Sequence, residues 1–204
     1  SDRVQNMVIR GFHTELEAVY EEKNISMGSD GSKQYAALWK LLTPTHPYGT
    51  QTTIGEQEHL KNPSIVNIKK YFNRYYVPNN VAITLAGDMN PDQVITIIDQ
   101  YFGSWHSSPD LSRPEFAAQK KISAPKDSSV VGQDAENLMM GWLFKGAAEL
   151  QNDTLDVIKS MLSNGKAGLF DININQQMKT QGVGAMLDEL RDYTAFIVHG
   201  APLQ

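Results

Sequence analysis

Residues 71–88 read YFNRYYVPNNVAITLAGD, and the change of pattern within this stretch decides the fold class. Its first part continues a helix that the apolar spacing predicts over residues 64–76. Its second part, Val81 to Ala86, is an apolar run rich in strand-forming residues and predicts a β-strand. Asn90 and Pro91 follow with the residue types of a helix N-cap and first turn, so a further helix is expected.

The flanking sequence predicts more helices and strands. Upstream, we expect a helix over residues 4–23, a break at 28–31, and a second helix capped by Ser32 that ends at Leu42. Downstream, residues 103–126 are rich in Ser and Pro and form the expected internal joint. Beyond it we expect strands at 129–132, 138–144, 183–187 and 195–199, and helices at 149–162 and 167–180. This mixture without strict βαβ order predicts an α+β fold, with helices packed on an antiparallel sheet.

Composition excludes several classes of protein. The chain has 204 residues and 41% hydrophobic content, enough for one large or two small cores. Its net charge of -5, pI near 5.5 and scattered basic residues argue against a nucleic-acid partner. No stretch approaches the ~20 apolar residues of a membrane span. The absence of cysteine excludes disulfides, thiol catalysis and cysteine metal sites, and leaves both a periplasmic and a cytoplasmic location open.

Two glutamates occupy unexpected positions on the first predicted helix. Most apolar residues of 4–24 fall on one broad arc, and Glu15 and Glu22 project into its middle, whereas Glu21 falls on the polar arc. A carboxylate that faces a core must be paired, hydrogen-bonded or bound to a metal. A rise of ~10.5 Å separates the two, which is too far to hold one ion comfortably, so one is a candidate ligand and the other its support. Buried salt bridges, or carboxylates that reach water past the helix edge, are the alternative.

The string FHTELEAVYEEKN at residues 12–24 resembles the segment that carries the third zinc ligand in the insulinase/pitrilysin family of zinc metallopeptidases. In that family a helix bears one acidic residue and, seven positions on, the glutamate that binds zinc. The resemblance implies that Glu22 is the zinc ligand and Glu15 an accessory acid. Further family motifs follow in the family's order, at His46-Pro47-Tyr48-Gly49, Ile54-Gly55 and 71–88.

The resemblance covers residues 4–105 well and the rest loosely. It implies that residues 1–105 are the remainder of the zinc-binding half of a metallopeptidase repeat and that 106–204 are a second α+β unit. The glycine-containing string at 163–170 follows a predicted helix, so it is interpreted as a helix C-cap and turn and not as a phosphate loop. Gly168 stands where the family has an arginine, which puts any role of that arginine in doubt.

The catalytic motif of the family is missing. These enzymes hold zinc through the histidines of an HxxEH helix, and nothing in residues 1–204 matches it. No two of the five histidines have helical metal-pair spacing, and each is expected to be a surface or hydrogen-bonded residue. A catalytic zinc needs three protein ligands, and this chain offers one at most.

We therefore interpret the chain as part of the catalytic-type N-terminal repeat of a zinc endopeptidase. The parent is expected to hydrolyse peptides or small unfolded proteins, with two zinc ligands outside this chain, and the isolated chain is expected to be inactive. Its expected partners are the peptide substrate and the remaining repeats or a partner subunit. The alternatives are a non-catalytic scaffold or peptide-binding subunit of the same fold, and an unrelated α+β domain. An HxxEH motif encoded upstream would favour the protease.

Overall fold

The computed structural model describes residues 2–203, which group into two compact units. Unit 1 contains residues 2–23 and 55–116, and unit 2 contains residues 24–54 and 117–203. This grouping differs from the predicted division between residues 105 and 106, because residues 24–54 pack with the C-terminal part of the chain.

Unit 2 is built on a three-stranded antiparallel sheet with the order β1-β3-β2. The strands are β1 (Leu138–Lys145), β2 (Gly182–Glu189) and β3 (Tyr193–Ala201), and Phe196 of β3 lies opposite both Trp142 and Leu187. These strands confirm the predicted strands at 138–144, 183–187 and 195–199 and the α+β class.

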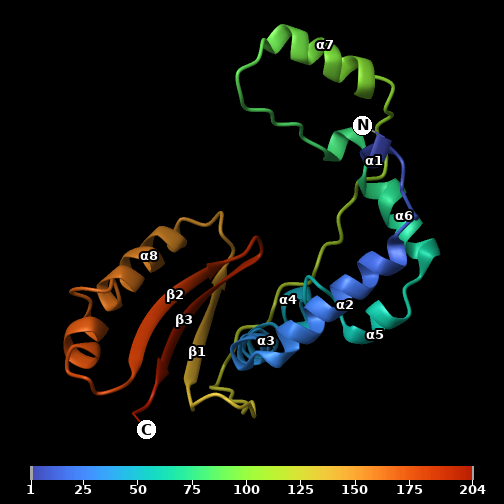
Figure 1. Ribbon diagram of the computed structural model, residues 1–204. Coiled ribbons are helices and arrows are strands. Elements are labelled where there is room, and N and C mark those ends of the chain that lie inside the picture. The colour runs from blue at the N-terminus through green and yellow to red at the C-terminus, as the bar shows by residue number, and fades with distance from the viewer. Residues whose placement is uncertain (1, 204) are drawn as a thin grey trace. The chain divides into compact units, whose positions relative to one another are not determined.

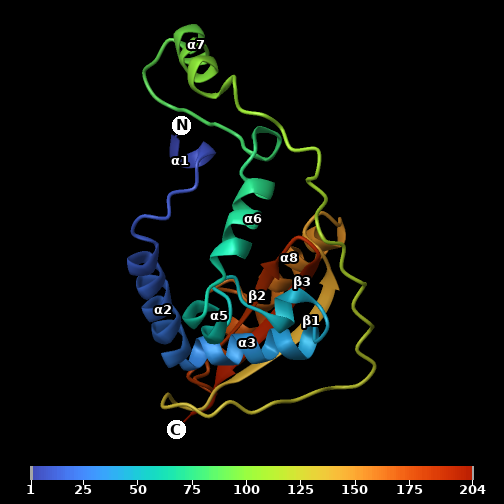
Figure 2. The same ribbon diagram turned by 90° about the vertical axis from the view of Figure 1, so that its right-hand side faces the viewer.

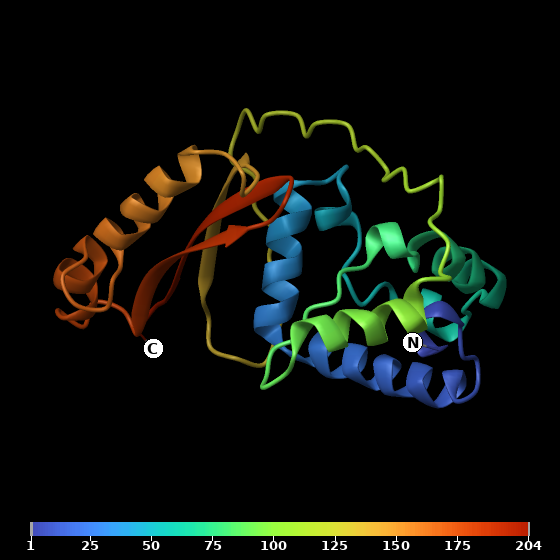
Figure 3. The ribbon, with the colours of Figure 1, turned by 90° about the horizontal axis from the view of Figure 1, so that it is seen from above.

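Side-chain alternation along β3 divides the core of unit 2 into two layers. Ala195 and Ile197 face helix α3 (Asp30–Leu42), and Phe196 and Val198 face helix α8 (Gln151–Leu162). The sheet therefore lies between the two helices, as Figures 1 and 3 show. In Figure 2, α3 crosses in front of the strands.

Helix α3 is held by a cap at its N-terminus and by side-chain hydrogen bonds to β2. Ser29 and not Ser32 caps it, because the Ser29 side chain accepts a hydrogen bond from the Ser32 N–H, at 3.4 Å. Leu38, Trp39 and Leu42 are buried, whereas Tyr35 on the same side of the helix is 38% exposed. The indole N–H of Trp39 donates to the Asp188 carboxylate of β2 at 3.0 Å, and Tyr35 OH also bonds to Asp188. Burial and this carboxylate raise the pKa of Tyr35 to about 12.

The segment between α8 and β2 is less helical than expected. The predicted helix at 167–180 is limited to a short region that includes η2 (Asp171–Asn175), and Met178 then adopts a positive φ of 48°. Asn175 Nδ2 donates to the carbonyl of Val183, and the Val183 N–H donates to Asn175 Oδ1, both at 2.9 Å. The Asn175 amide thus takes the place of a strand neighbour at the start of β2.

Unit 1 is helical. It contains α1 (Asp2–Gln5), most of α2 (Phe12–Gly28), α5 (Gln57–Lys61), α6 (Ile65–Tyr75), the short η1 (Pro78–Asn80) and α7 (Pro91–Phe102). Asn90 caps α7 as predicted, by accepting from the N–H groups of Asp92 and Gln93. Within residues 2–203, no helix has the length and apolar character needed to cross a bilayer.

The first helix departs from the prediction of one helix over 4–23. Helix α2 begins at Phe12 because Gly11 adopts a positive φ of 82°, which interrupts the helical path after α1. At its other end α2 runs to Gly28, past the predicted end at residue 23, and α3 begins at Asp30, so the break expected at 28–31 is reduced to Ser29.

Two predicted strands have no partner in the described part of the chain. Residues 81–86 and 129–132 belong to no β-ladder, although Val81 has the extended φ and ψ of −124° and 137°. A β-strand requires a hydrogen-bonding neighbour, and the sequence pattern alone does not supply one. The apolar side chains Ile83 and Leu85 are therefore exposed.

Candidate functional site

Helix α2 carries both glutamates that the sequence singles out. Its first turn closes where the Glu15 N–H donates to the carbonyl of Gly11, at 3.1 Å. Glu15 and Glu22 are seven residues apart, so they lie within ~20° of each other around the axis, separated by ~10.5 Å of rise. The structure thus keeps the two carboxylates on one side of one helix, as the periodicity predicted.

That side of α2 is accessible to solvent, which contradicts the prediction that Glu15 and Glu22 face a core. Both glutamates are exposed, and Ile25 on the same side is 76% exposed. The prediction failed because the expected apolar arc included Val8 and Ile9, which lie before α2 in non-helical backbone. Among residues 2–203, neither glutamate has an ion pair or a side-chain hydrogen bond, so the alternative of buried salt bridges also finds no support within them.

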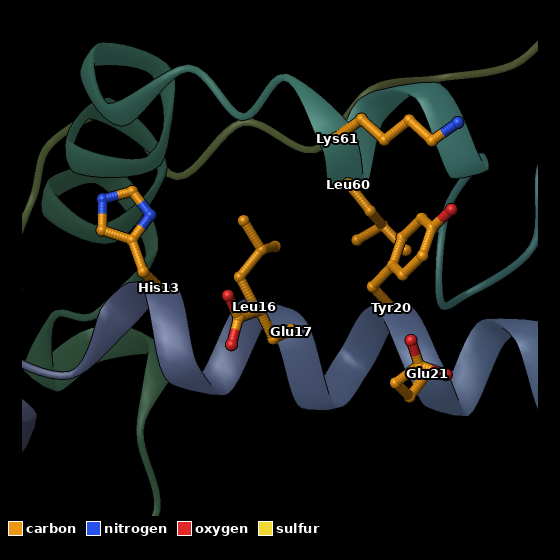
Figure 4. A pocket seen from close by; sticks show the side chains of 7 residues that line it. All are labelled: His13, Leu16, Glu17, Tyr20, Glu21, Leu60 and Lys61. Atoms are coloured by element: carbon orange, nitrogen blue, oxygen red, sulfur yellow. The ribbon is translucent and has the colours of Figure 1, made fainter.

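The opposite side of α2 faces α5 across a cleft of about 270 Å³. Figure 4 shows Leu16 and Tyr20 of α2 directed toward the segment that carries Leu60 and Lys61. Gln57 of α5 donates a hydrogen bond to Tyr20 OH at 2.9 Å, and Lys61 Nζ lies 6.0 Å from the centre of the Tyr20 ring. The α2 residues that line the cleft are His13, Leu16, Glu17, Tyr20 and Glu21.

Glu21 and Glu22 lie on different sides of α2 with respect to the cleft. Glu21 lines it, whereas Glu22 lies ~180° around the helix from the centre of the lining residues. Two neighbouring glutamates therefore have different surroundings. One lines the cleft between α2 and α5, and the other lies on the far side of the helix.

The exposed carboxylate of Glu22 can bind a metal, but it cannot complete a site alone. No group of three His, Asp or Glu side chains in residues 2–203 is placed to hold a metal ion. A catalytic zinc takes three protein ligands and keeps a further position for water. The donor set present therefore fits one ligand of such a centre.

The motif His46-Pro47-Tyr48-Gly49 has a structural position in unit 2. His46 is 2% exposed and caps α4 (Pro47–Thr50), because its Nδ1 accepts from the Tyr48 N–H at 3.3 Å. Its Nε2 lies 3.5 Å from Asp192 Oδ2, next to β3. A Cβ atom on Gly49 would lie 2.3 Å from the Thr43 carbonyl, so the close approach requires glycine. This confirms the expectation of a hydrogen-bonded histidine.

The glycine-containing turn after α8 surrounds a buried carboxylate that the sequence reasoning missed. The N–H of Asn164 at 2.9 Å and that of Gly168 at 3.1 Å donate to Asp171 Oδ2. These bonds hold the pKa of Asp171 below its ordinary value. An internal anion therefore occupies N–H groups that a phosphate would need, as expected for a C-cap and turn. The available signal was an acid three residues after a glycine-rich turn.

Gly168 has a steric reason to be glycine. A Cβ atom there would lie 2.6 Å from the carbonyl oxygen of Leu162 and 2.8 Å from Asp171 Oδ2. This close approach leaves no room for a side chain at the position where the resemblance expects arginine.

Comparisons with known proteins identify what the chain resembles. Residues 65–202 match the family described as the peptidase M16 inactive domain. The zinc protease PqqE of Helicobacter pylori is 25% identical over 125 residues, which are 60% of this chain and 28% of that protein. The uncharacterized zinc protease YmxG of Bacillus subtilis is 28% identical over 109 residues, which are 52% of this chain and 26% of that protein.

Solved structures show the same fold. A protease from Helicobacter pylori has a TM-score of 0.75 at 21% identity and matches 97% of this chain and 49% of its own. Pitrilysin has a TM-score of 0.69 at 16% identity and matches 95% of this chain and 22% of its own. The chain thus spans half the length of these relatives, or less.

Proposed function

The chain belongs to the peptidase M16 family, and we propose that its parent protein is a zinc-dependent endopeptidase in which Glu22 is one of three protein ligands to the metal. The proposed substrates are peptides and small unfolded proteins. The two other ligands lie outside the 204 residues, on an HxxEH helix of the kind that the sequence resemblance implies. The isolated chain is therefore proposed to be inactive.

The accessibility of Glu22 supports this role. Its carboxylate is exposed and has no cationic partner among residues 2–203, so its oxygens remain available to a metal. The side of α2 that carries it also has the exposed apolar Ile25, which a second helix could cover. A segment that packs there would bring its own ligands to Glu22.

The two glutamates would have different roles. When bound, zinc lowers the pKa of a coordinated water and generates the nucleophile for peptide hydrolysis. Glu22 would bind the metal through its carboxylate. Glu15 lies ~10.5 Å away along the axis, so it would act as a positioning residue that hydrogen-bonds to the segment carrying the other ligands.

Relatives support the metal and the reaction class at a coarse level. Two curated relatives carry the name zinc protease, although the chain matches only 28% and 26% of their lengths. Their names describe those proteins, and zinc and peptide hydrolysis are proposals for this one.

A non-catalytic scaffold or peptide-binding subunit is the second candidate. It is favoured by the description of the matching family, residues 65–202, as an inactive domain. It is also compatible with the absence of a three-ligand metal group in residues 2–203. The reading frame upstream separates the two candidates, since only the protease requires HxxEH.

Glu22→Gln and Glu21→Gln in the parent protein test the proposal. Loss of an outer hydrogen-bonding partner costs a metal site about 10- to 100-fold, so loss of the ligand Glu22 should cost more than about 100-fold in kcat/KM and release the zinc. Glu21→Gln, on the α5 side, should leave both unchanged. Zinc content by mass spectrometry and hydrolysis of a fluorogenic peptide are the measurements. Equal effects of the two variants, or full zinc content in Glu22→Gln, would reject Glu22 as the ligand.

A further inference from the structure

A second surface lies in unit 2, far along the sequence from Glu22. It is a groove of about 370 Å³ between α8 and the sheet, and it is lined only by apolar side chains. They come from β1, β3, α8 and the segment after α8, and they are Met140, Trp142, Phe144, Leu155, Ile158, Leu162, Phe170, Phe196 and Val198.

The groove exists because α8 covers only part of its face of the sheet. Helix α8 packs on β2, and Leu155 of the helix and Phe196 of β3 are buried where the helix meets the sheet. On the same face, Met140 and Trp142 of β1 remain 42% and 48% exposed, and Ile158 of α8 is 41% exposed. An apolar groove left open in this way is a candidate interaction site.

The lining determines what can bind. It offers side chains on a sheet face and no hydrogen-bonding group, so it cannot anchor a polar ligand or satisfy the backbone of an extended peptide. An α-helix satisfies its own backbone and needs only an apolar stripe to fill such a groove. We propose that the groove holds an amphipathic helix contributed by the part of the same polypeptide that lies outside these 204 residues.

The length of the relatives supports this source. The Helicobacter pylori protease matches 97% of this chain with only 49% of its own, so about as much polypeptide again lies outside the matched part. A helix that belongs to the same polypeptide would be present at a high effective concentration, which suits a groove without polar anchors.

Trp142 provides a direct probe of the groove. The chain has two other tryptophans. Trp39 is 2% exposed, so acrylamide hardly reaches it, and Trp105 can be replaced with Phe. In that variant, collisional quenching by acrylamide reports mainly on Trp142. The quenching constant should be several-fold lower in the complete polypeptide encoded by the reading frame than in the 204-residue chain. This readout involves neither zinc nor hydrolysis, so it can fail or succeed independently of the proposed function.

Ile158→Ser and Val157→Ser are matched variants on one helix, since Ile158 lines the groove and Val157 lies outside it and is exposed. In the complete polypeptide, Ile158→Ser should lower the Tm more than Val157→Ser does. The decrease caused by Ile158→Ser should also be larger in the complete polypeptide than in the 204-residue chain. Three results would overturn the proposal. The first is equal quenching of Trp142 in both proteins. The second is shielding of Trp142 in the 204-residue chain that increases with protein concentration, which would indicate a second copy. The third is a reading frame that encodes nothing further.

Discussion

Buried apolar residues of unit 2 form clusters on both faces of β3, whereas the only buried apolar residue in the described part of unit 1 is Val77. Helices α6 and α7 of unit 1 are amphipathic, yet several of their apolar side chains are more than half exposed, among them Val66, Tyr71 and Ile95. Unit 2 therefore has a core of its own, and unit 1 has almost none.

The difference bears on the candidate site, because Glu15 and Glu22 lie in unit 1. Helices without tertiary packing are marginally stable in water, so the α2 region depends on whatever packs against it. Assembly of the proposed metal site and folding of unit 1 would then be the same event. Unit 2 has its own buried clusters, so we expect its folding not to require that event.

The largest effect should come from the core of unit 2. Ile197→Ala removes a fully buried side chain from the central strand and should cost about 2–5 kcal/mol in the free energy of unfolding. Val66→Ala on α6 of unit 1, where the side chain is 62% exposed, should cost less than about 0.5 kcal/mol. Urea unfolding followed by circular dichroism measures both. Similar losses for the two variants would show that unit 1 has a core comparable with that of unit 2.

The next effect concerns the close approach at Gly49. Gly49→Ala places a Cβ 2.3 Å from the Thr43 carbonyl and should destabilise unit 2 by about 1–3 kcal/mol. Gly28→Ala is the matched control, because nothing lies within 4 Å of its Cβ position and its φ is not positive. That control should be neutral or stabilising by up to about 1 kcal/mol. An unchanged Tm in Gly49→Ala would contradict the contact.

Acidification should lower the stability of unit 2 by protonating Asp171. The N–H of Asn164, together with that of Gly168, holds the pKa of Asp171 below its ordinary value. A lowered folded-state pKa stabilises the fold above the unfolded value of about 3.9, and this stabilisation is lost as the pH falls through the folded value. Asp171→Asn should be less stable than the wild type at neutral pH, and the difference should shrink on acidification.

Asp127→Asn, at an exposed position outside the helices and strands, serves as the control and should leave Tm unchanged at each pH. Thermal melts between neutral pH and pH 2 would follow both variants. A constant deficit of Asp171→Asn across that range would mean that the carboxylate charge is not what stabilises the turn.

The smallest effect should be that of Glu22→Gln in the 204-residue chain. Its side chain is exposed and has no ion pair in residues 2–203, so the substitution should change the free energy of unfolding by less than about 0.5 kcal/mol. Thermal melts at neutral pH suffice. A clear loss of stability would reveal a cationic partner and argue against a carboxylate kept free for metal.

Elements governed by local signals could be predicted from the sequence. The Asn90 cap lies next to the N–H groups it serves, and the apolar runs at 138–144 and 195–199 find partners in one sheet. Residues 81–86 have an equally good strand pattern but no partner within residues 2–203, and the pattern cannot report that. The break at Gly11 depends on a positive φ that glycine permits but does not require.

For the candidate site, the positions of the side chains around α2 could be predicted, but their burial could not. Helical periodicity places Glu15 and Glu22 on one side of α2, and it separates Glu22 from Glu21. Periodicity cannot establish whether a side is covered, because burial depends on what packs there. The buried acid is instead Asp171, whose environment arises from a turn with no repeating pattern.

The amide of Asn175 also limits how unit 2 can polymerise. It occupies both backbone groups of Val183 at the outer edge of β2, whereas β1 forms a ladder only with β3 in the described chain. Exposed strand edges are where fibril growth by strand addition begins. The Asn175 amide leaves Val183 no backbone group for an incoming strand, so pairing along the edge of β2 has to start beyond this residue.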